Sequence, residues 1–589
     1  MCGIVGYIGN KKDTLDILMN GLKHLEYRGY DSSGIAYMTS GRLVIKKEAG
    51  KLENLKETID FNDESNIGIG HTRWATHGVA NKINSHPHKF GDIVIVHNGI
   101  IENYLELKQK LIKKGYEFIS ETDTEVAAAL LNDLYIKDYN MPKAIEKFKE
   151  IVRGTYAIIV MSIKENNCLY VIKKGSPLVI GIGDDGYYIG SDILAFIKYT
   201  NKYVTLLDYE YAKIEMHKLT IFSETNQEKK YTINEIDIDN NEVSKNGYKH
   251  YMLKEINEEP AIVRKILNNK IDIDLKKYKK IVIVGCGSAM HAGVIGVNLL
   301  REYANIDANI EIASEFRYKK LFLDKDSLVM AISQSGETAD TLEAVKIAKE
   351  HGAYTIGIVN VKDSSIARCV DNVIYTECGP EIAVATTKAY LGQVLIMILL
   401  TVDNCIFSEL VKEFKKDINK LPVLVQNLID NTELIQKLAK KIYKKEHLFF
   451  IGRGIDYAIS LEASLKLKEI SYIHSEAYAA GELKHGTISL IDKDIPVIGI
   501  VTDKKIADKT ISNMKEVKAR GAYVIYVTLD SLYKEGDFYD DVIIIPTLNE
   551  LLNPILTIIP LQLLAYYVAK LKKCDIDKPK NLAKSVTVE

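Results

Sequence analysis

Two patterns of hydrophobic and polar positions divide the chain near residue 240. In the first part, short apolar runs alternate with amphipathic segments, which predicts strands and helices of a layered α+β domain. The expected strands include 67–70, 93–96 and 157–161, and the expected helices include 14–25 and 124–134. A polar stretch, 240–249, follows and is interpreted as a linker.

From about residue 275 the apolar runs are short and continuous, and helical segments separate them. This pattern is typical of strands that are buried on both faces of a parallel, doubly wound sheet. The expected strands are 281–284, 327–332, 355–359, 448–451, 496–501 and 523–527.

The second part also repeats itself. Val284-Gly285-Cys286-Gly287 resembles Ile451-Gly452-Arg453-Gly454, with the first glycines at 285 and 452, and Gly352-Ala353-Tyr354 recurs at 521–523. Because the two repeated segments have nearly the same spacing, we expect two copies of one α/β module. The interface between the two copies is a candidate ligand site.

Size and composition set limits on the function. A chain of 589 residues is too long for one core, and a formal net charge of −2 gives no electrostatic reason to expect nucleic acid or an anionic membrane as a partner. The seven cysteines contain no C-x-x-C pair, so neither a disulfide framework nor a zinc site is expected, and a reducing cytoplasm is favoured.

The apolar stretch 551–570 contains Asn553, Pro554, Pro560 and Gln562 and is predicted to be a buried helix. No leader segment is expected before Cys2.

Cys2 is a candidate nucleophile. If Met1 is removed, the thiol lies beside its own α-amino group, which has a pKa of ~7.7 to 8 and is a built-in base. Arg73 suits a carboxylate, Asn98 and Gly99 suit an oxyanion, and Asp123 suits an amine, although Thr122-Asp123 equally suits a helix cap.

Five histidines lie within 27 residues, namely His71, His77, His86, His88 and His97. One interpretation of this cluster is a metal site. No H-E-x-x-H spacing accompanies them, so structural roles are favoured and no metal or other cofactor is expected. Trp74, the single tryptophan, is either a core residue or a movable gate.

Five segments of the first part resemble the class II glutamine amidotransferases: 2–6, 28–34, 71–78, 97–103 and 122–123. The resemblance implies a four-layer N-terminal-nucleophile (Ntn) hydrolase fold in which Cys2 attacks the side-chain amide of glutamine. It further implies that Asn98 and Gly99 form the oxyanion hole, and that glutamine is bound by Arg73, Thr76, His77 and Asp123.

In the second part, Ser333-Gln334-Ser335-Gly336-Glu337-Thr338 follows an apolar strand and precedes a helix. Hydroxyls and backbone N–H groups converge there, which predicts a phosphate site, while the alternative is an ordinary helix cap. The absence of a Walker lysine favours a monophosphorylated metabolite over a nucleoside triphosphate.

Glu462, Lys466 and Glu469 share one face of a predicted helix, and His485 follows within 20 residues. An exposed salt-bridge ladder is one interpretation. The other is acid–base chemistry on a sugar, since a carboxylate, a lysine and a histidine suit proton transfer. The C-terminal residues 581–589 would ordinarily be considered frayed.

These segments resemble the two sugar isomerase (SIS) domains of the glutamine:fructose-6-phosphate amidotransferase family, over nearly the whole chain. The resemblance implies transfer of the glutamine amide nitrogen to fructose 6-phosphate, giving glucosamine 6-phosphate and glutamate, in a homodimer with an ammonia channel gated by Trp74. Glu469 would move the proton between C1 and C2, with Lys466 assisting, His485 opening the ring and Lys584 forming a Schiff base. The sugar phosphate would be bound by Ser288, Ser333, Gln334, Ser335, Thr338, Val384 and Ala583.

The expected organisation is a glutaminase domain (1–240), a linker with a lead-in helix (241–274), two SIS domains (275–420 and 421–575) and a tail (576–589) that closes the sugar site. One departure from the family pattern is Ala289, where a phosphate-binding serine is usual. The missing hydrogen bond is expected to lower sugar affinity about tenfold.

Three other functions fit parts of the sequence. Another class II amidotransferase, of the purine phosphoribosyl or asparagine synthetase type, would need a different acceptor half. A sugar-phosphate sensor would need neither Cys2 nor the combination of Glu469, His485 and Lys584. A deglycase would keep the second half without the glutaminase.

Overall fold

The computed structural model describes residues 2–74, 77–165, 167–236, 244–269, 271 and 273–587. The chain divides into two compact units, Met1–Glu242 together with Ser585–Glu589, and Val243–Lys584. Each unit is described by itself.

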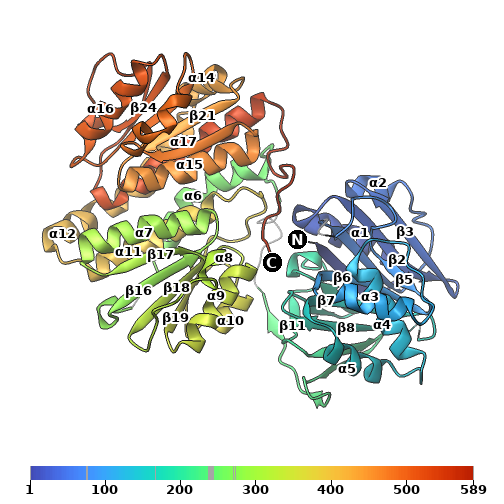
Figure 1. Ribbon diagram of the computed structural model, residues 1–589. Coiled ribbons are helices and arrows are strands. Elements are labelled where there is room, and N and C mark those ends of the chain that lie inside the picture. The colour runs from blue at the N-terminus through green and yellow to red at the C-terminus, as the bar shows by residue number, and fades with distance from the viewer. Residues whose placement is uncertain are drawn as a thin grey trace. The chain divides into compact units, whose positions relative to one another are not determined.

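Two antiparallel sheets form the first unit (Figure 1). The eight-stranded sheet has the order β15-β11-β9-β10-β1-β4-β2-β3 and the seven-stranded sheet the order β14-β13-β12-β8-β7-β6-β5. Their strands are β1 (Gly3–Gly9), β2 (Ser32–Thr39), β3 (Arg42–Ala49), β4 (Ile67–Arg73), β5 (His88–Phe90), β6 (Ile93–Ile101), β7 (Gly154–Ser162), β8 (Cys168–Lys174), β9 (Val179–Gly183), β10 (Gly186–Gly190), β11 (Lys202–Thr205), β12 (Tyr211–Glu215), β13 (Lys218–Phe222), β14 (Glu228–Lys229) and β15 (Asn234–Glu235).

Helices cover the outer face of each sheet, which makes four layers. The core between the sheets contains apolar residues from both, such as Ile4 and Ile69 from one and Val96 and Ile159 from the other. The helices are α1 (Thr14–Leu25) and α2 (Leu52–Lys56) on the first sheet and α3 (Tyr104–Ile112), α4 (Asp123–Tyr135) and α5 (Met141–Ile151) on the second, with short 3-10 turns η1 (Glu26–Arg28) and η2 (Ile193–Ala195). The predicted four-layer α+β fold is confirmed.

The second unit contains two parallel five-stranded sheets with the same strand order, β17-β16-β18-β19-β20 and β22-β21-β23-β24-β25 (Figure 1). The strands of the first sheet are β16 (Lys280–Gly285), β17 (Ala308–Ile312), β18 (Ser327–Ser333), β19 (Tyr354–Val359) and β20 (Asn372–Tyr375). Those of the second are β21 (His447–Gly452), β22 (His474–Ala479), β23 (Pro496–Val501), β24 (Tyr523–Leu529) and β25 (Asp541–Ile545).

The two copies agree in detail at the start of each module. The helices that follow the first strands, α7 (Ser288–Ala304) and α15 (Ile455–Ser471), both have 17 residues. Gly287 and Gly454 precede them with the same φ of 55°, and both helices end in a left-handed residue, Asn305 and Tyr472. The predicted repeat is therefore an internal duplication of one doubly wound module.

The other helices of this unit cover the sheets and join the modules. They are α6 (Tyr251–Leu267), α8 (Ala313–Phe316), α9 (Ala339–Glu350), α10 (Ser365–Cys369), α11 (Lys388–Asn404), α12 (Ser408–Asp417), α13 (Leu421–Asp430), α14 (Glu433–Ile442), α16 (Ala507–Lys518) and α17 (Asn553–Leu571), with short 3-10 turns η3 (Leu275–Lys277), η4 (Ile418–Lys420), η5 (Glu482–His485), η6 (Thr487–Leu490), η7 (Asp530–Leu532) and η8 (Glu550–Leu552).

Helix α17 is apolar on all sides. The segment Glu550–Leu571 is long and apolar enough to cross a membrane, but 94% of its most apolar window is buried inside the protein. It packs against α13, α14 and α15 in the main core of the unit. The prediction of a buried core helix is confirmed.

Candidate active sites

The Cys2 thiol lies at the end of a strand ladder that brings distant residues beside it. Strand β1 pairs with β4 so that Gly3 is opposite Thr72, which places Cys2 next to Arg73 and Trp74. The backbone N–H of Trp74 donates to Cys2 Sγ at 3.2 Å, and the sulfur lies 3.5 Å from the carbonyl oxygen of Trp74. Burial raises the pKa of the Cys2 thiol, while the Trp74 N–H and the Arg73 guanidinium act to lower it.

Asn98 and Gly99, on β6, lie on the other side of the nucleophile. The Asn98 amide donates from Nδ2 to the carbonyl oxygen of Cys2 at 2.9 Å. Gly99 has a φ of +132°, and a Cβ there would lie 2.1 Å from the carbonyl oxygen of Thr155, so only glycine fits. The predicted oxyanion residues are thus adjacent to Cys2.

The buried histidines form a network behind Asn98. Nε2 of His71 lies 3.1 Å from Asn98 Oδ1 and 3.0 Å from the carbonyl oxygen of His97, and the rings of His71 and His86 stack at 4.0 Å. Nδ1 of His97 lies 3.0 Å from the Thr124 hydroxyl, and Nε2 of His88 lies 3.2 Å from that of Thr122.

Burial lowers the pKa of His71 to about 3 and also lowers the pKa values of His86, His88 and His97. These imidazoles are therefore neutral hydrogen-bonding groups. In the described part of the chain, no cluster of three or more ligands suited to a metal ion occurs. The geometry favours the structural interpretation of the histidines.

Arg73 and Asp123 are both buried, and Arg73 lies close enough to the thiol to lower its pKa. The guanidinium donates to the carbonyl oxygens of His77 and Gly78, which fixes the loop after β4. Asp123 is the first residue of α4, and its carboxylate accepts from the N–H of Ile101 at 2.8 Å. Asp123 raises the pKa of Arg73, which burial lowers, so the two groups lie within electrostatic reach.

The remaining predicted glutaminase residues fall on the same loop. Thr76 lies outside the described residues. The His77 ring contacts Tyr104 edge-on at 5.2 Å. Trp74 is half-buried and packs edge-on against Tyr30 at 6.1 Å, so the structure shows its packing and its role as a gate stays a prediction.

Asp31 is a residue of this site to which the sequence assigned no role. Its charge raises the pKa of both Cys2 and Arg73, and its N–H donates to the carbonyl oxygen of Arg73 at 3.0 Å. The one sequence feature that could have indicated Asp31 is its position in segment 28–34, which resembles the class II glutamine amidotransferases.

The predicted phosphate loop connects β18 to α9. The hydroxyls of Ser333 and Thr338 are 2.9 Å apart, and Ser333 Oγ accepts from the N–H of Gly336 at 3.1 Å. Gly336 has a φ of +65°, and a Cβ there would lie 2.0 Å from Ser364 Oγ. The side chain of Glu337 is turned away to accept from the N–H of Ser365 at 2.8 Å, so hydroxyls and N–H groups define the loop.

Ser288 connects this edge of the sheet to the second module. It begins α7 at the carboxyl end of β16, which neighbours β18. Its hydroxyl donates to Glu462 Oε1 at 2.8 Å, and His291 Nδ1 lies 2.8 Å from Glu462 Oε2. Glu462 is on α15, so the helix with the predicted acid–base residues packs directly against the phosphate-loop module.

Lys466 lies between two carboxylates on α15. Its Nζ is 2.6 Å from Glu469 Oε2 and 3.5 Å from Glu462 Oε1, and its side chain is 1% exposed. Burial acts to lower the pKa of Lys466, but the carboxylates of Glu469 and Glu462 outweigh it and raise the value. The alternative of an exposed salt-bridge ladder is wrong, because the group is buried.

The tail lysine joins the same region. Lys584 forms an ion pair with Glu381, and the two side chains are 4% and 0% exposed. Oε1 of Glu381 also accepts from the N–H groups of Thr387 and Ala389, at the start of α11. Glu381 also contributes to the raised pKa of Lys466, so the Lys584–Glu381 pair lies within electrostatic reach of Lys466 on α15.

Val384 follows Glu381 in the chain, and the half-buried Ala583 precedes Lys584 in the tail. The N–H of Val384 donates to the carbonyl oxygen of Asp577, which ties the segment to the tail. Glu255, on α6, accepts from the N–H groups of Ile382 at 2.6 Å and Ala383 at 3.1 Å. Burial and the nearby Glu381 raise the pKa of Glu255 to about 7. Sequence reasoning missed both Glu255 and Glu381, since buried acidic residues have no periodic signature.

No contact of His485 with the other predicted acid–base residues occurs in the described chain. His485 ends η5 and is exposed, and within the described chain no hydrogen bond or ion pair joins it to Lys466 or Glu469. The half-buried Gln334 and Ser335 lie in the phosphate loop as expected.

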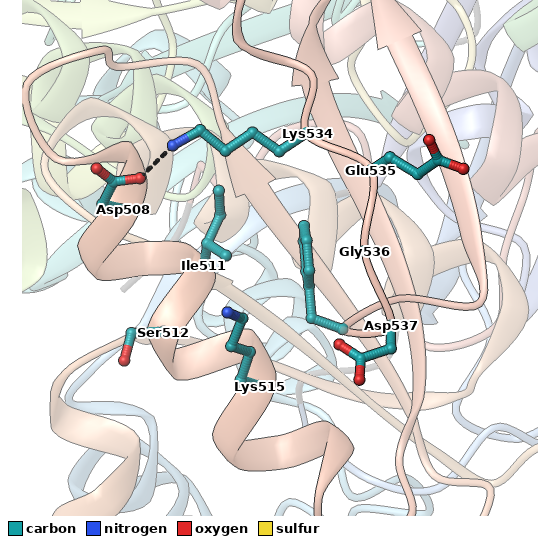
Figure 2. A pocket seen from close by; sticks show the side chains of 9 residues that line it. Asp508, Ile511, Ser512, Lys515, Lys534, Glu535, Gly536 and Asp537 are labelled. Carbon is teal, nitrogen blue, oxygen red and sulfur yellow. Dashed lines mark hydrogen bonds and ion pairs between the residues drawn. The ribbon is translucent and has the colours of Figure 1, made fainter.

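A separate hollow of about 360 Å³ lies between α16 and the loop 534–538 (Figure 2). Lys534 spans its mouth and pairs with Asp508 at 2.5 Å. Its lining contains none of the predicted site residues. This hollow is therefore not one of the two candidate active sites, which are recognised by the side chains that converge at Cys2 and at Lys466.

Comparisons with known proteins identify both halves. The chain matches the glutamine amidotransferase domain over residues 71–198 and the SIS domain over residues 274–402 and 441–572. Fold and sites thus define an amidotransferase with a glutaminase half and a sugar isomerase half.

The chain belongs to the glutamine--fructose-6-phosphate aminotransferase [isomerizing] family. It is 47% identical to the relative of that name from Caldanaerobacter subterraneus subsp. tengcongensis and 45% identical to the one from Pyrococcus horikoshii, and each alignment covers 100% of both chains. The C-terminal domain of glucosamine-fructose-6-phosphate aminotransferase from Francisella tularensis covers 57% of this chain and 99% of its own, with 38% identity and a TM-score of 0.54.

Proposed function

We propose that this chain transfers the amide nitrogen of glutamine to fructose 6-phosphate and isomerises the product to glucosamine 6-phosphate. The observation that carries the proposal is the presence of two sites in one family member. One is a thiol next to Asn98 and Arg73, with Asp123 within electrostatic reach of Arg73. The other is a serine-rich loop whose module contacts Glu462, which pairs with Lys466 on α15.

In the glutaminase half, the Cys2 sulfur attacks the amide carbon of glutamine, the carbon–nitrogen bond breaks and ammonia leaves. Water then hydrolyses the glutamyl thioester, which releases glutamate and restores the thiol. The α-amine that removal of Met1 would expose takes and returns the proton. Asn98 Nδ2 and the Gly99 N–H stabilise the oxyanion, which requires Asn98 to exchange its bond to the Cys2 carbonyl for the substrate oxygen. Arg73 and Asp123 bind the carboxylate and amine of glutamine, with Thr76 and His77 beside them, and Trp74 gates the passage of ammonia.

In the isomerase half, Ser333, Gln334, Ser335 and Thr338 bind the phosphate, with Ser288, Val384 and Ala583 around the sugar. Glu469 moves the proton between C1 and C2, and Lys466, whose Nζ lies 2.6 Å from Glu469 Oε2, assists. His485 opens the sugar ring. The amine of Lys584 adds to the carbonyl carbon and water leaves; because only a neutral amine can add, the pair with Glu381 has to open first. Ammonia then adds to the imine carbon and displaces the Lys584 amine, so the nitrogen stays on the sugar.

The test compares glucosamine 6-phosphate formation from glutamine and fructose 6-phosphate in wild type, C2A and C369A. Cys369 is a half-buried cysteine on α10, so C369A is the matched control and should keep full activity. Product that requires Cys2 supports the proposal. Fructose 6-phosphate binding without product in wild type would favour a sugar-phosphate sensor.

Removal of Met1 is tested by intact mass together with a glutaminase assay. Retained methionine would block the amine and should abolish glutamine use. Full activity in a chain that keeps Met1 would contradict the proposed role of the amine.

Three further points are proposed. The domain limits 1–240, 275–420 and 421–575 are supported by the matched ranges. A cytoplasmic location is supported by seven cysteines that are all free thiols, and cell fractionation tests it.

The proposed assembly is a homodimer. It would have twice the 66.3 kDa mass of one chain, which light scattering measures.

A further inference from the structure

The second SIS module has a loop of the same length as the phosphate loop of the first, and the two loops follow equivalent strands. Residues 334–338 connect β18 to α9, and residues 502–506 connect β23 to α16, so the two loops are equally long. Ser333 and Val501 each form the last pair of their strand with the next strand, opposite Val359 and Thr528. The loops therefore leave equivalent points of the two sheets.

A carboxylate fills the second loop. Asp456 is 1% exposed and accepts from the N–H of Thr502 at 2.9 Å, from the Thr502 hydroxyl at 2.5 Å and from the N–H of Asp503 at 3.4 Å. By strand register, Thr502 and Asp503 correspond to Gln334 and Ser335. Asp456 thus accepts from the N–H groups that correspond to those of the predicted phosphate site.

The corresponding residue in the first module is Ala289. Both Ala289 and Asp456 are the second residue of a 17-residue helix that follows a glycine of the same conformation. A methyl group cannot accept a hydrogen bond, so Ala289 cannot be the acceptor that Asp456 is in the second loop. Oxyanions of a carboxylate and of a phosphate compete for the same donors at such a strand-to-helix turn.

The side chains of the second loop agree with this difference. Val501 and Ile506 stand where the first loop has Ser333 and Thr338, so two hydroxyls are absent. Asp503 adds a further negative charge where the first loop has Ser335. Burial raises the pKa of Asp456 to about 6, and its bonds to Thr502 and Asp503 oppose that rise, so the group is mainly ionised above pH 7.

We propose that the Asp456 carboxylate is a built-in anion that closes the second module to phosphates, while Ala289 keeps the loop of the first module open. The chain then has one sugar-phosphate site although it has two SIS modules. The assignment of the open loop to the sugar phosphate rests on the proposed function. The closure of the second loop stands on its own geometry.

The direct test transfers the aspartate to the first module. Isothermal titration of fructose 6-phosphate into wild type should give one site per chain. A289D should weaken that binding by about 100-fold or more, because a second carboxylate then faces the phosphate. A289N has the same shape without the charge and should lose much less. Wild-type affinity in A289D, or an equal loss in A289N, would overturn the proposal.

The reverse test opens the second loop. In D456A/D503S the two acidic residues are replaced by the residues of the first module, alanine and serine, and inorganic phosphate should raise the melting temperature of this variant by more than it raises that of wild type. Sodium chloride at the same ionic strength is the control. No phosphate-specific gain, or two phosphate sites in wild type, would contradict the proposal. If D456A/D503S does not fold, the A289D comparison still decides.

The two hypotheses fail differently. If wild type binds no fructose 6-phosphate at all, the proposed function fails and the phosphate measurements on D456A/D503S still test the closed loop. If wild type binds one sugar phosphate and A289D binds it equally well, the inference about Asp456 fails and the proposed function stands.

Discussion

Nε2 of His71 lies 3.1 Å from Oδ1 of Asn98, and the same Asn98 donates through Nδ2 to the carbonyl oxygen of Cys2. Since an amide whose Nδ2 donates has only its oxygen left to accept, His71 Nε2 is the donor and determines which way the amide points. The predicted oxyanion residue is therefore oriented by a buried, neutral imidazole.

We expect H71A to lower the kcat of the glutaminase reaction about tenfold with little change in KM, because the amide loses the bond that orients it and not its own donor. H71Q places an amide donor nearby and should recover part of the loss. Steady-state glutaminase kinetics measure both. A wild-type kcat in H71A would show that Asn98 is oriented by other contacts.

We expect G336A to raise the KM for fructose 6-phosphate at least tenfold, because the new Cβ would overlap the Ser364 hydroxyl and displace the phosphate loop. Gly352 has a comparable φ of +81° with nothing within 4 Å of its Cβ position, so G352A is the matched control for backbone strain alone. Equal effects of the two variants on KM would exclude the steric explanation.

We expect E381Q to lower the midpoint of urea unfolding, because it leaves the Lys584 ammonium buried without its carboxylate; breaking such a pair typically costs about 3 to 5 kcal/mol. The double variant E381Q/K584M removes the charge as well and should be more stable than E381Q. A double-mutant cycle measures the coupling. Additive effects would show that the pair does not hold the tail.

Glu259 should make stability depend on pH. It is fully buried on α6, faces Gln562, Glu381 and Lys388, and burial raises its pKa well above the ordinary value. The folded state then keeps a proton that the unfolded state has released. Stability is greatest below the unfolded pKa and falls as pH rises toward the folded pKa, by up to about 1.4 kcal/mol per pH unit.

We therefore expect E259Q to be increasingly more stable than wild type as pH rises from 5 to 9. Glu255, whose pKa of about 7 acts in the same direction, is present in both proteins and cancels in the comparison. Melting temperatures across this range measure the difference. A constant difference between the two proteins would mean that Glu259 is ionised throughout.

Most elements could be predicted from the sequence because their hydrophobic periods are strong. The predicted helix 14–25 is α1, the predicted strand 496–501 is β23, and the spacing between Gly285 and Gly452 is that of two superimposable module starts. The glutaminase residues could also be located, since they lie in a few short segments. Local pattern and motif were sufficient for these features.

Buried charges could not be found in this way. A sequence shows that Lys466 shares a helix face with Glu462 and Glu469, but burial of that face depends on the packing of α15 against α7. Glu381 and Lys584 are 203 positions apart and meet because the tail returns to the start of α11.

The sequence by itself determined the two classes of domain, the internal repeat and the identity of the nucleophile candidate, because each depends on residues that are close along the chain. Only the tertiary structure decided that Asp456 accepts hydrogen bonds from the loop after β23, and that His71 orients Asn98. Those relationships depend on strand register and helix packing, which bring together groups that no local pattern connects.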